Sequence, residues 1–255
     1  MENLFLSDVS VLCGEGVATV RMNREEKLNA LNASVLDQLC YVFREIGQAR
    51  DIRLAVLTGA GDKAFAAGAD LAEIAALEGI EQLREYYRQF HVLYSVMGEI
   101  PQPIIARVNG WAFGGGCLLA LAADLVIATG KSSFSQPEVN FGFTGGAALL
   151  PRLVGRHRAA EITMLGRPFT AEEAYRMGLV NRVVEEDALD GEVAKFTGQL
   201  LKKDALALSM IKRVIRGSYE TGLSGACLYE DECSAICLCR PESKQAILNF
   251  VNRKP

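Results

Sequence analysis

Three consecutive glycines, Gly114, Gly115 and Gly116, stand where a short apolar run ends and a helical pattern begins. Residues 104–108 form an apolar run of strand length, and the turn signal at 109–110 follows it. Glycines at a helix start leave backbone N–H groups uncovered at the positive end of the helix dipole. Such groups can bind an anion or stabilise a developing oxyanion, although glycine loops of this kind also serve close packing alone.

A second segment of small residues, KAFAAGADL at 63–71, ends in an acid and precedes a short helical pattern. Small side chains let another backbone or a ligand approach closely. A tight loop without a ligand has the same composition, so this segment alone does not decide between the two. Glu138, in the segment QPE at 136–138, is the carboxylate nearest to a further glycine-containing loop. On its own, it also fits a surface residue without a role.

The composition excludes several functional classes. The chain has 255 residues, half of them hydrophobic, which suits one large core with room for a small helical appendage. The net charge is −4 and no basic cluster stands out, so we expect no nucleic-acid partner. Arg107, Asn109 and Asp124 interrupt the most apolar stretch, so we expect no membrane span. The N-terminus lacks a basic region followed by an apolar one, which predicts the cytoplasm, or an organelle matrix after removal of a transit peptide.

Cysteine and histidine spacing argues against a metal site and against a serine hydrolase. Cys233 and Cys237 would share one face of a helix, but no histidine and no C-x-x-C pair accompanies them. We therefore predict no metal and reduced cysteines. There are two histidines, His91 and His157, and no G-x-S-x-G sequence, so a Ser-His-Asp hydrolase has little support.

The order of the patterns divides the chain into two parts. We predict a hairpin from residues 9–13 and 17–22, a helix that starts at Ser34, and an amphipathic helix at 80–97. Residues 151–165 read as one helix, and the pattern is helical from 187 onward. The sequence thus predicts a mixed α/β core in residues 1–186 and a helical region in residues 187–255.

Three segments together are far more specific than any one of them. They are KAFAAGADL at 63–71, NGWAFGGGC at 109–117 and QPEVNFGFTGG at 136–146. In this order and spacing they resemble the crotonase superfamily of enoyl-CoA hydratases and isomerases, and the likeness extends over nearly the whole chain. The resemblance implies an α/β fold, a spiral of ββα turns with a helical C-terminal trimerisation region. It also implies a homotrimer or a dimer of trimers, and an acyl-CoA thioester substrate with no separate cofactor.

The resemblance also assigns roles to individual residues. The backbone N–H groups of Ala69 and Gly115 would form an oxyanion hole for the thioester carbonyl, each worth about 3 kcal/mol in the transition state. Glu138 would be the catalytic carboxylate, and Arg24 would lie near the CoA phosphates. The residues expected to bind CoA or substrate are Lys27, Leu28, Ala67, Gly68, Ala69, Asp70, Leu71, Gly114 and Lys254.

One position departs from the hydratases of this superfamily, which carry a glutamate directly after GGGC and another in QPE. Here the first position is Leu118 and the second is Glu138. Addition of water across a double bond is readily served by two carboxylates with separated pKa values. Moving a double bond between C3 and C2 needs a single base, and a buried Glu with a raised pKa suits that task. Leucine after the glycines therefore favours a Δ3-Δ2-enoyl-CoA isomerase.

Other reactions remain as alternatives. The chain is a candidate hydratase, decarboxylase or thioesterase of the same superfamily, with a carboxylate such as Glu73 or Glu85 in place of the missing one. A non-catalytic acyl-CoA-binding or assembly subunit is a further alternative, against which Glu138 argues.

Overall fold

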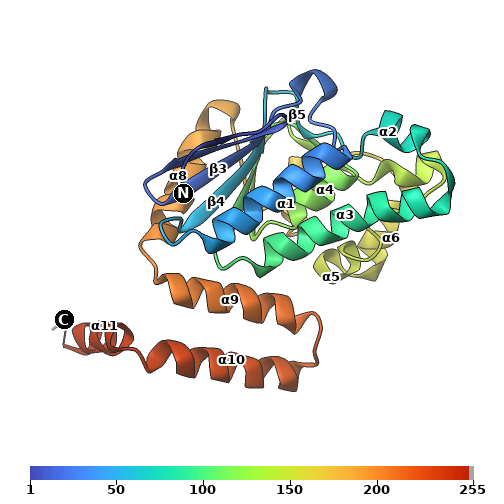
Figure 1. Ribbon diagram of the computed structural model, residues 1–255. Helices are drawn as coiled ribbons and strands as arrows, with labels where there is room; N and C mark the ends of the chain where they lie inside the picture. Colours follow the sequence, from blue (N-terminus) through green and yellow to red (C-terminus); the bar gives the residue numbers. More distant parts are fainter. Residues whose placement is uncertain (253–255) are drawn as a thin grey trace.

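Two β-sheets wrapped by helices make up the computed structural model, which describes residues 1–252 (Figure 1). The larger sheet has the strand order β1-β2-β3-β4-β6-β8-β11, and the smaller has the order β10-β9-β7-β5. The strands are β1 (Leu4–Phe5), β2 (Val9–Gly14), β3 (Val17–Met22), β4 (Leu54–Gly59), β5 (Ala64–Ala66), β6 (Ile104–Val108), β7 (Trp111–Phe113), β8 (Leu125–Thr129), β9 (Ser133–Ser135), β10 (Phe169–Thr170) and β11 (Arg182–Val184).

Helices cover both sheets and form all of the described C-terminal part. They are α1 (Ala33–Gln48), α2 (Leu71–Ala76), α3 (Gly79–Glu99), α4 (Gly115–Leu121), α5 (Leu150–Val154), α6 (Arg156–Leu165), α7 (Ala171–Arg176), α8 (Leu189–Leu201), α9 (Ala205–Ser218), α10 (Leu223–Leu238) and α11 (Pro241–Val251), with 3-10 turns η1 (Glu25–Lys27), η2 (Pro137–Phe141) and η3 (Glu186–Ala188). No helix within residues 1–252 is both long and apolar enough to cross a membrane.

The sheets are built by a repeating unit that sends one strand to each of them. Strands β4, β6 and β8 are parallel neighbours in the large sheet, and β5, β7 and β9 are parallel neighbours in the small one. After each small-sheet strand the chain enters a helix: α2 after β5, α4 after β7 and η2 after β9. Because parallel neighbours end at the same edge of a sheet, these three helix starts are brought together.

Burial on both faces explains the sequence of the large sheet. All six residues of β4 are buried, and β6 is buried except for Arg107. Such continuous apolar runs are typical of parallel strands covered on both sides. The main core lies between the sheets, α1 and α3, while α8 packs Leu189 and Val193 against the other face of the large sheet.

Some local predictions are confirmed and others are wrong. Strands β2 and β3 form the expected antiparallel hairpin. Helix α1 is capped by Asn32, whose side chain accepts a hydrogen bond from the Val35 N–H (2.9 Å), whereas Ser34 already lies inside the helix and binds Asp8. The single helix expected at 151–165 is two helices, because Gly155 adopts φ +75° between them.

The predicted division at residue 186 follows the change from mixed elements to helices alone. Helix α8 nevertheless packs on the large sheet, so the boundary separates elements by type rather than by contact.

Figure 1 shows α10 and α11 beyond α9, on the side away from the sheets. Several large apolar side chains there are exposed, among them Leu223 (82%), Phe250 (76%) and Val251 (70%). A surface of this kind is costly to leave in water, so assembly through the C-terminal helices stays our prediction.

We expect a trimer or hexamer in solution, because association would remove the apolar side chains of α10 and α11 from water. Light scattering at micromolar concentration should give three or six times the chain mass of 27.7 kDa. Leu228→Arg places a charge on this surface and should shift the mass toward one chain, whereas the same change at exposed Phe5, on the first strand, should not. A monomeric parent protein would contradict the prediction.

Candidate active site

One large cavity, of about 1240 Å³, lies beside the three helix starts that follow the small-sheet strands. Helices α3 and α9 contribute to its walls. The predicted site residues that line it are Ala67, Gly68, Ala69, Leu71, Gly114, Gly115, Leu118 and Glu138. Lys27, Leu28 and Asp70 do not line it, and Lys254 lies outside the described residues.

The two glycine-containing loops touch through their backbones. Gly68 has φ +106° and Gly114 has φ +50°, values that side chains disfavour. A Cβ atom built on Gly68 would lie 2.9 Å from the carbonyl oxygen of Phe113 and 3.7 Å from the Cα of Gly114. The glycines therefore serve both close packing and a candidate binding site. The contact that only glycines permit also brings the two loops to one wall of the cavity.

Each loop leaves a backbone N–H without a partner at this wall. Ala67 N–H donates to Leu28 O (3.0 Å) and Asp70 N–H to Leu31 O (3.0 Å), while the Ala69 N–H between them has no acceptor within residues 1–252. Gly115 is the first residue of α4, and its N–H likewise has no acceptor in the described chain. Two free donors on one cavity wall are what the predicted oxyanion hole requires.

Gln136 holds the peptide group that joins Gly114 to Gly115. Its side chain is buried, and Nε2 donates to Gly114 O at 3.1 Å. The same carbonyl oxygen accepts the Leu118 N–H at 3.1 Å. Two donors on one oxygen fix the plane of that peptide and hence the direction of the Gly115 N–H. Gln136 is not among the predicted site residues, although it stands two residues before Glu138.

Glu138 lies on the same cavity, on the turn η2 that follows β9 and begins at Pro137. Its residue is 8% exposed, and its Oε2 atom has no hydrogen-bond partner in the described chain. Burial raises the pKa of this carboxyl above its ordinary value. A Cβ atom on Gly114 would lie 2.8 Å from Glu138 Oε1, so the carboxylate lies directly beside the loop of the predicted oxyanion hole. A base of raised pKa next to two free N–H donors suits proton transfer beside a carbonyl group.

Comparison with known proteins agrees with this geometry. A profile described as enoyl-CoA hydratase/isomerase matches residues 13–255. The chain belongs to this family.

Relatives and solved structures of the enoyl-CoA hydratase/isomerase family resemble the chain over nearly its full length. A crotonyl-CoA hydratase of Syntrophomonas wolfei is 34% identical over 243 residues, which are 94% of this chain and 93% of that protein. A probable mitochondrial enoyl-CoA hydratase of Dictyostelium discoideum is 32% identical over 93% of this chain and 86% of its own. The crystal structure of an enoyl-CoA hydratase from Mycobacterium smegmatis matches with a TM-score of 0.93 at 30% identity, over 98% of both chains. The predicted crotonase-like fold is confirmed.

Leu118 lies on the cavity, one helical turn after Gly115, and brings no acid to it. The two carboxylates suggested as replacements are placed elsewhere. Glu73 accepts the Ala33 N–H through Oε2 (2.9 Å), and neither it nor Glu85 lines the cavity. Both oxygens of Glu85 are bound by Arg88 at the surface (2.7 and 2.8 Å). Glu138 is therefore the carboxylate beside the predicted oxyanion hole, with no second one from either candidate.

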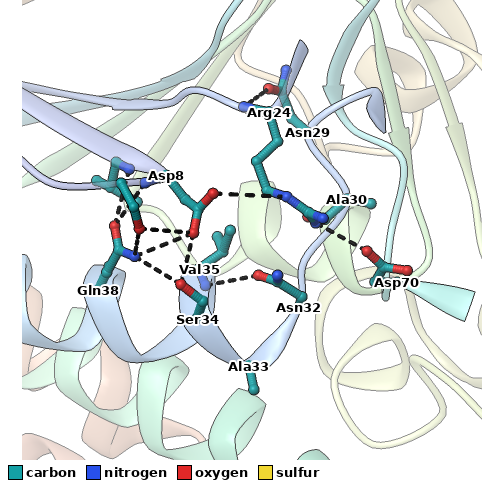
Figure 2. A network of polar contacts seen from close by, with 12 residues as sticks. Asp8, Arg24, Asn29, Ala30, Asn32, Ala33, Ser34, Val35, Gln38 and Asp70 are labelled. Carbon is teal, nitrogen blue, oxygen red and sulfur yellow. Dashed lines mark hydrogen bonds and ion pairs between the residues drawn. The ribbon is translucent and has the colours of Figure 1, made fainter. Parts of the chain in front are cut away.

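Arg24 is occupied inside the protein rather than free to meet a phosphate (Figure 2). Its Nη1 atom donates to Asp70 Oδ2 (3.0 Å) and Ala30 O (2.7 Å), and its Nε atom lies 3.9 Å from Asp8 Oδ1. Asp70 in turn caps α2 by accepting N–H groups at the helix start. A contact of both residues with CoA stays a prediction, and in the structure their side chains bind each other and brace the loop that carries Ala69. Lys27, three residues later, is exposed.

At another part of the cavity wall, the buried Lys212 of α9 forms an ion pair with a more exposed carboxylate. Its Nζ atom contacts Asp124 Oδ2 (2.9 Å) and also donates to the carbonyl oxygens of Met97 (2.8 Å) and Gln102 (3.0 Å). Burial lowers the pKa of Lys212, and the carboxylate of Asp124 opposes that effect. Because all three of its hydrogens are used, Lys212 fastens α9 to the core rather than offering a free charge to a ligand.

Replacement of Gln136 by Met should impair catalysis more than binding. The Met side chain keeps the volume but cannot donate to Gly114 O, so the Gly115 N–H loses part of its orientation. We expect kcat on an enoyl-CoA substrate to fall about tenfold, less than the 10²–10³-fold typical for loss of a whole oxyanion donor, with KM nearly unchanged. The carbonyl stretching frequency of a bound unreactive acyl-CoA should shift toward its value in water.

Gln102→Met is the matched control, because Gln102 is a buried amide that binds the carbonyl oxygens of Ile46, Ala49 and Ile52. It should lower thermal stability and leave kcat and the carbonyl frequency unchanged. If the two variants have the same kcat and the same frequency, Gln136 has no special effect on the oxyanion hole.

Proposed function

We propose that the protein transfers protons at C2 of enoyl-CoA thioesters, and that hydration of a 2-enoyl-CoA is its main reaction. The observation that carries this proposal is the unpartnered Oε2 atom of Glu138 in one cavity with the free N–H groups of Ala69 and Gly115. A thioester carbonyl bound by the two N–H groups would place C2 and C3 within reach of the carboxylate.

Each group has a separate task in the proposed reaction. The N–H groups of Ala69 and Gly115 stabilise the negative charge that the thioester oxygen acquires when an enolate forms. Glu138 takes a proton from the attacking water or from the substrate and returns it to carbon. The apolar wall, including Leu118 and Phe90, keeps bulk water from this carboxylate and so maintains its raised pKa.

Two observations favour different reactions of this one site. The names of the relatives support hydration, because the proteins of Syntrophomonas wolfei and Dictyostelium discoideum are named hydratases. Leu118 supports isomerisation between 3-enoyl- and 2-enoyl-CoA as the second candidate, because that reaction needs one base and no bound water. Decarboxylation and thioester hydrolysis have no specific support in the geometry.

The remaining parts of the proposal concern binding and assembly. Lys27 and Leu28 remain proposed CoA-binding residues. The assembly we propose is a trimer or a dimer of trimers. The reaction needs no cofactor, because CoA arrives as part of the substrate. We propose a cytoplasmic or organelle-matrix location.

A panel of CoA esters tests the proposal directly. The purified protein should hydrate crotonyl-CoA with a kcat on the order of 10 s⁻¹, a value typical of enzymes, and should isomerise 3-hexenoyl-CoA more slowly. Malonyl-CoA should be neither decarboxylated nor hydrolysed. Faster isomerisation than hydration would establish the second candidate, and inactivity on all of these esters would refute both.

Glu138→Gln should abolish hydration and isomerisation together, by about 10²–10⁴-fold, because the amide cannot accept a proton. Binding of the CoA ester should change little, since the side chain keeps its shape. The exposed Glu172→Gln is the matched control and should keep full activity. Retention of either activity in Glu138→Gln would show that another group is the base.

The pH dependence should reveal the same carboxyl. Because burial raises the pKa of Glu138, kcat/KM should fall as the pH drops through a value above the ordinary pKa of glutamate. Below the pKa that Glu138 has in the unfolded chain, the carboxyl is protonated in both the folded and the unfolded state, and its burial does not lower the free energy of unfolding. As the pH rises from that pKa to the higher pKa of the folded state, the free energy of unfolding falls. Glu138→Gln should therefore raise the melting temperature at pH 7, and this gain should disappear below about pH 4. An unchanged melting temperature at pH 7 would contradict the assignment of Glu138 as a buried, unpaired charge.

A further inference from the structure

Hydration sets a requirement that the site described so far does not meet. A water molecule that attacks C3 must be held so that its lone pair faces the carbon, which requires an acceptor for each of its two hydrogens. The free Oε2 atom of Glu138 supplies one acceptor. Leu118 occupies the position from which the family's hydratases offer the second, and leucine accepts no hydrogen bond.

Several other polar side chains of the cavity are already engaged. Lys212 is bound to Asp124, and Arg216 donates to the carbonyl oxygen of Ser95 (2.9 Å). Arg152 donates to Tyr219 O at 2.8 Å. The lysine and the two arginines are donors in any case, and a water molecule poised for attack needs acceptors.

Tyr94, on helix α3, has a hydroxyl group in a suitable place. It lines the cavity and donates its hydrogen to Gly115 O at 3.3 Å. In an α-helix a carbonyl at position i lies beside the side chains one turn later, so the hydroxyl lies on the same turn of α4 as Leu118. Because its hydrogen is used by Gly115, its oxygen has lone pairs available only as an acceptor.

The surroundings also keep Tyr94 in the neutral form that this role needs. Burial is the main cause that raises the pKa of Tyr94, and the nearby groups Cys117 and Glu138 raise it further. Burial, and to a smaller extent Glu138, also raises the pKa of Tyr87, the neighbouring tyrosine of the same cavity wall. The Tyr87 ring instead packs toward Phe143, with centroids 6.2 Å apart, and its hydroxyl has no bond to α4 within the described chain.

We propose that the hydroxyl of Tyr94 holds the attacking water and replaces the carboxylate that is absent at Leu118. One water hydrogen binds Glu138 Oε2 and the other binds the Tyr94 oxygen. This inference rests on the proposed hydration and names a further catalytic residue for it.

The atoms balance with one base. Glu138 removes a proton from the water, and the new C3–O bond forms while the C2=C3 electron pair moves toward the thioester. The charge resides on the thioester oxygen, bound by Ala69 and Gly115 N–H. Glu138 then gives its proton to C2, the carbonyl reforms, and the carboxylate is regenerated. Tyr94 exchanges no proton in this sequence, and isomerisation, which uses no water, does not involve it.

Tyr94→Phe removes only the hydroxyl and separates the two reactions. We expect kcat for crotonyl-CoA hydration to fall about tenfold or more, while kcat for 3-hexenoyl-CoA isomerisation changes less than about twofold. Tyr87→Phe removes the other tyrosine hydroxyl of this wall and is the comparison variant, which should not lower hydration selectively. Equal loss of both activities in Tyr94→Phe would indicate a structural role, and no loss, or a selective loss in Tyr87→Phe, would also overturn the proposal.

A second variant keeps the test decisive if Tyr94→Phe is poorly folded. Leu118→Glu supplies a new acceptor on the same helical turn, so in that background Tyr94→Phe should lower hydration much less than in the parent. Equal losses in the two backgrounds would overturn the proposal. A parent protein that isomerises but does not hydrate would refute the hydration function itself, whereas a hydrating parent with a fully active Tyr94→Phe variant would refute the role of Tyr94 alone.

Discussion

The backbone contact between Gly68 and Gly114 is the constraint on which the site depends. The loops that carry these residues come from different turns of the spiral, and they meet because side chains are absent at both positions. That contact places the Ala69 and Gly115 N–H groups on one wall, and it leaves room for Glu138 beside Gly114. A methyl group on Gly114 would lie 2.8 Å from Glu138 Oε1, so the predicted oxyanion hole and the proposed base require the same glycine.

Charge is buried in two different ways around this cavity. Lys212 has a partner for every hydrogen, and its ion pair with Asp124 fixes α9 against the core. Glu138 has an oxygen without any partner in the described chain. A fully paired buried charge contributes to a defined structure, whereas an unpaired carboxylate in an apolar wall raises the free energy of its charged form. The second arrangement weakens folding and, in the proposed reaction, supplies a base, so the ion pair serves stability and the unpaired carboxylate serves chemistry.

The sequence predicts the elements and glycine loops better than the contacts between them. The hairpin β2–β3 and the strand β6 follow from local patterns that any fold would have to obey. The bracing of the Ala69 loop by Arg24, and the bond from Gln136 to Gly114, depend on which turns of the spiral meet, and no local pattern encodes that. The resemblance places Arg24 near the CoA phosphates, and a basic side chain near a binding loop looks the same in sequence whether it meets a ligand or Asp70.

Leucine instead of glutamate at position 118 changes the electrostatics of the site, and it also removes one hydrogen-bond acceptor. Two carboxylates in one cavity repel each other and titrate as a coupled pair, so the pKa of each depends on the charge of the other. With leucine at 118, the raised pKa of Glu138 arises from burial, without a neighbouring acid on α4. A neutral tyrosine oxygen can accept a hydrogen from water without adding a second negative charge. Glu138 can thus remain ionised at a lower pH than it would beside another carboxylate. With the tyrosine oxygen as acceptor, a site whose helix α4 carries leucine at 118 can still bind the water that hydration consumes.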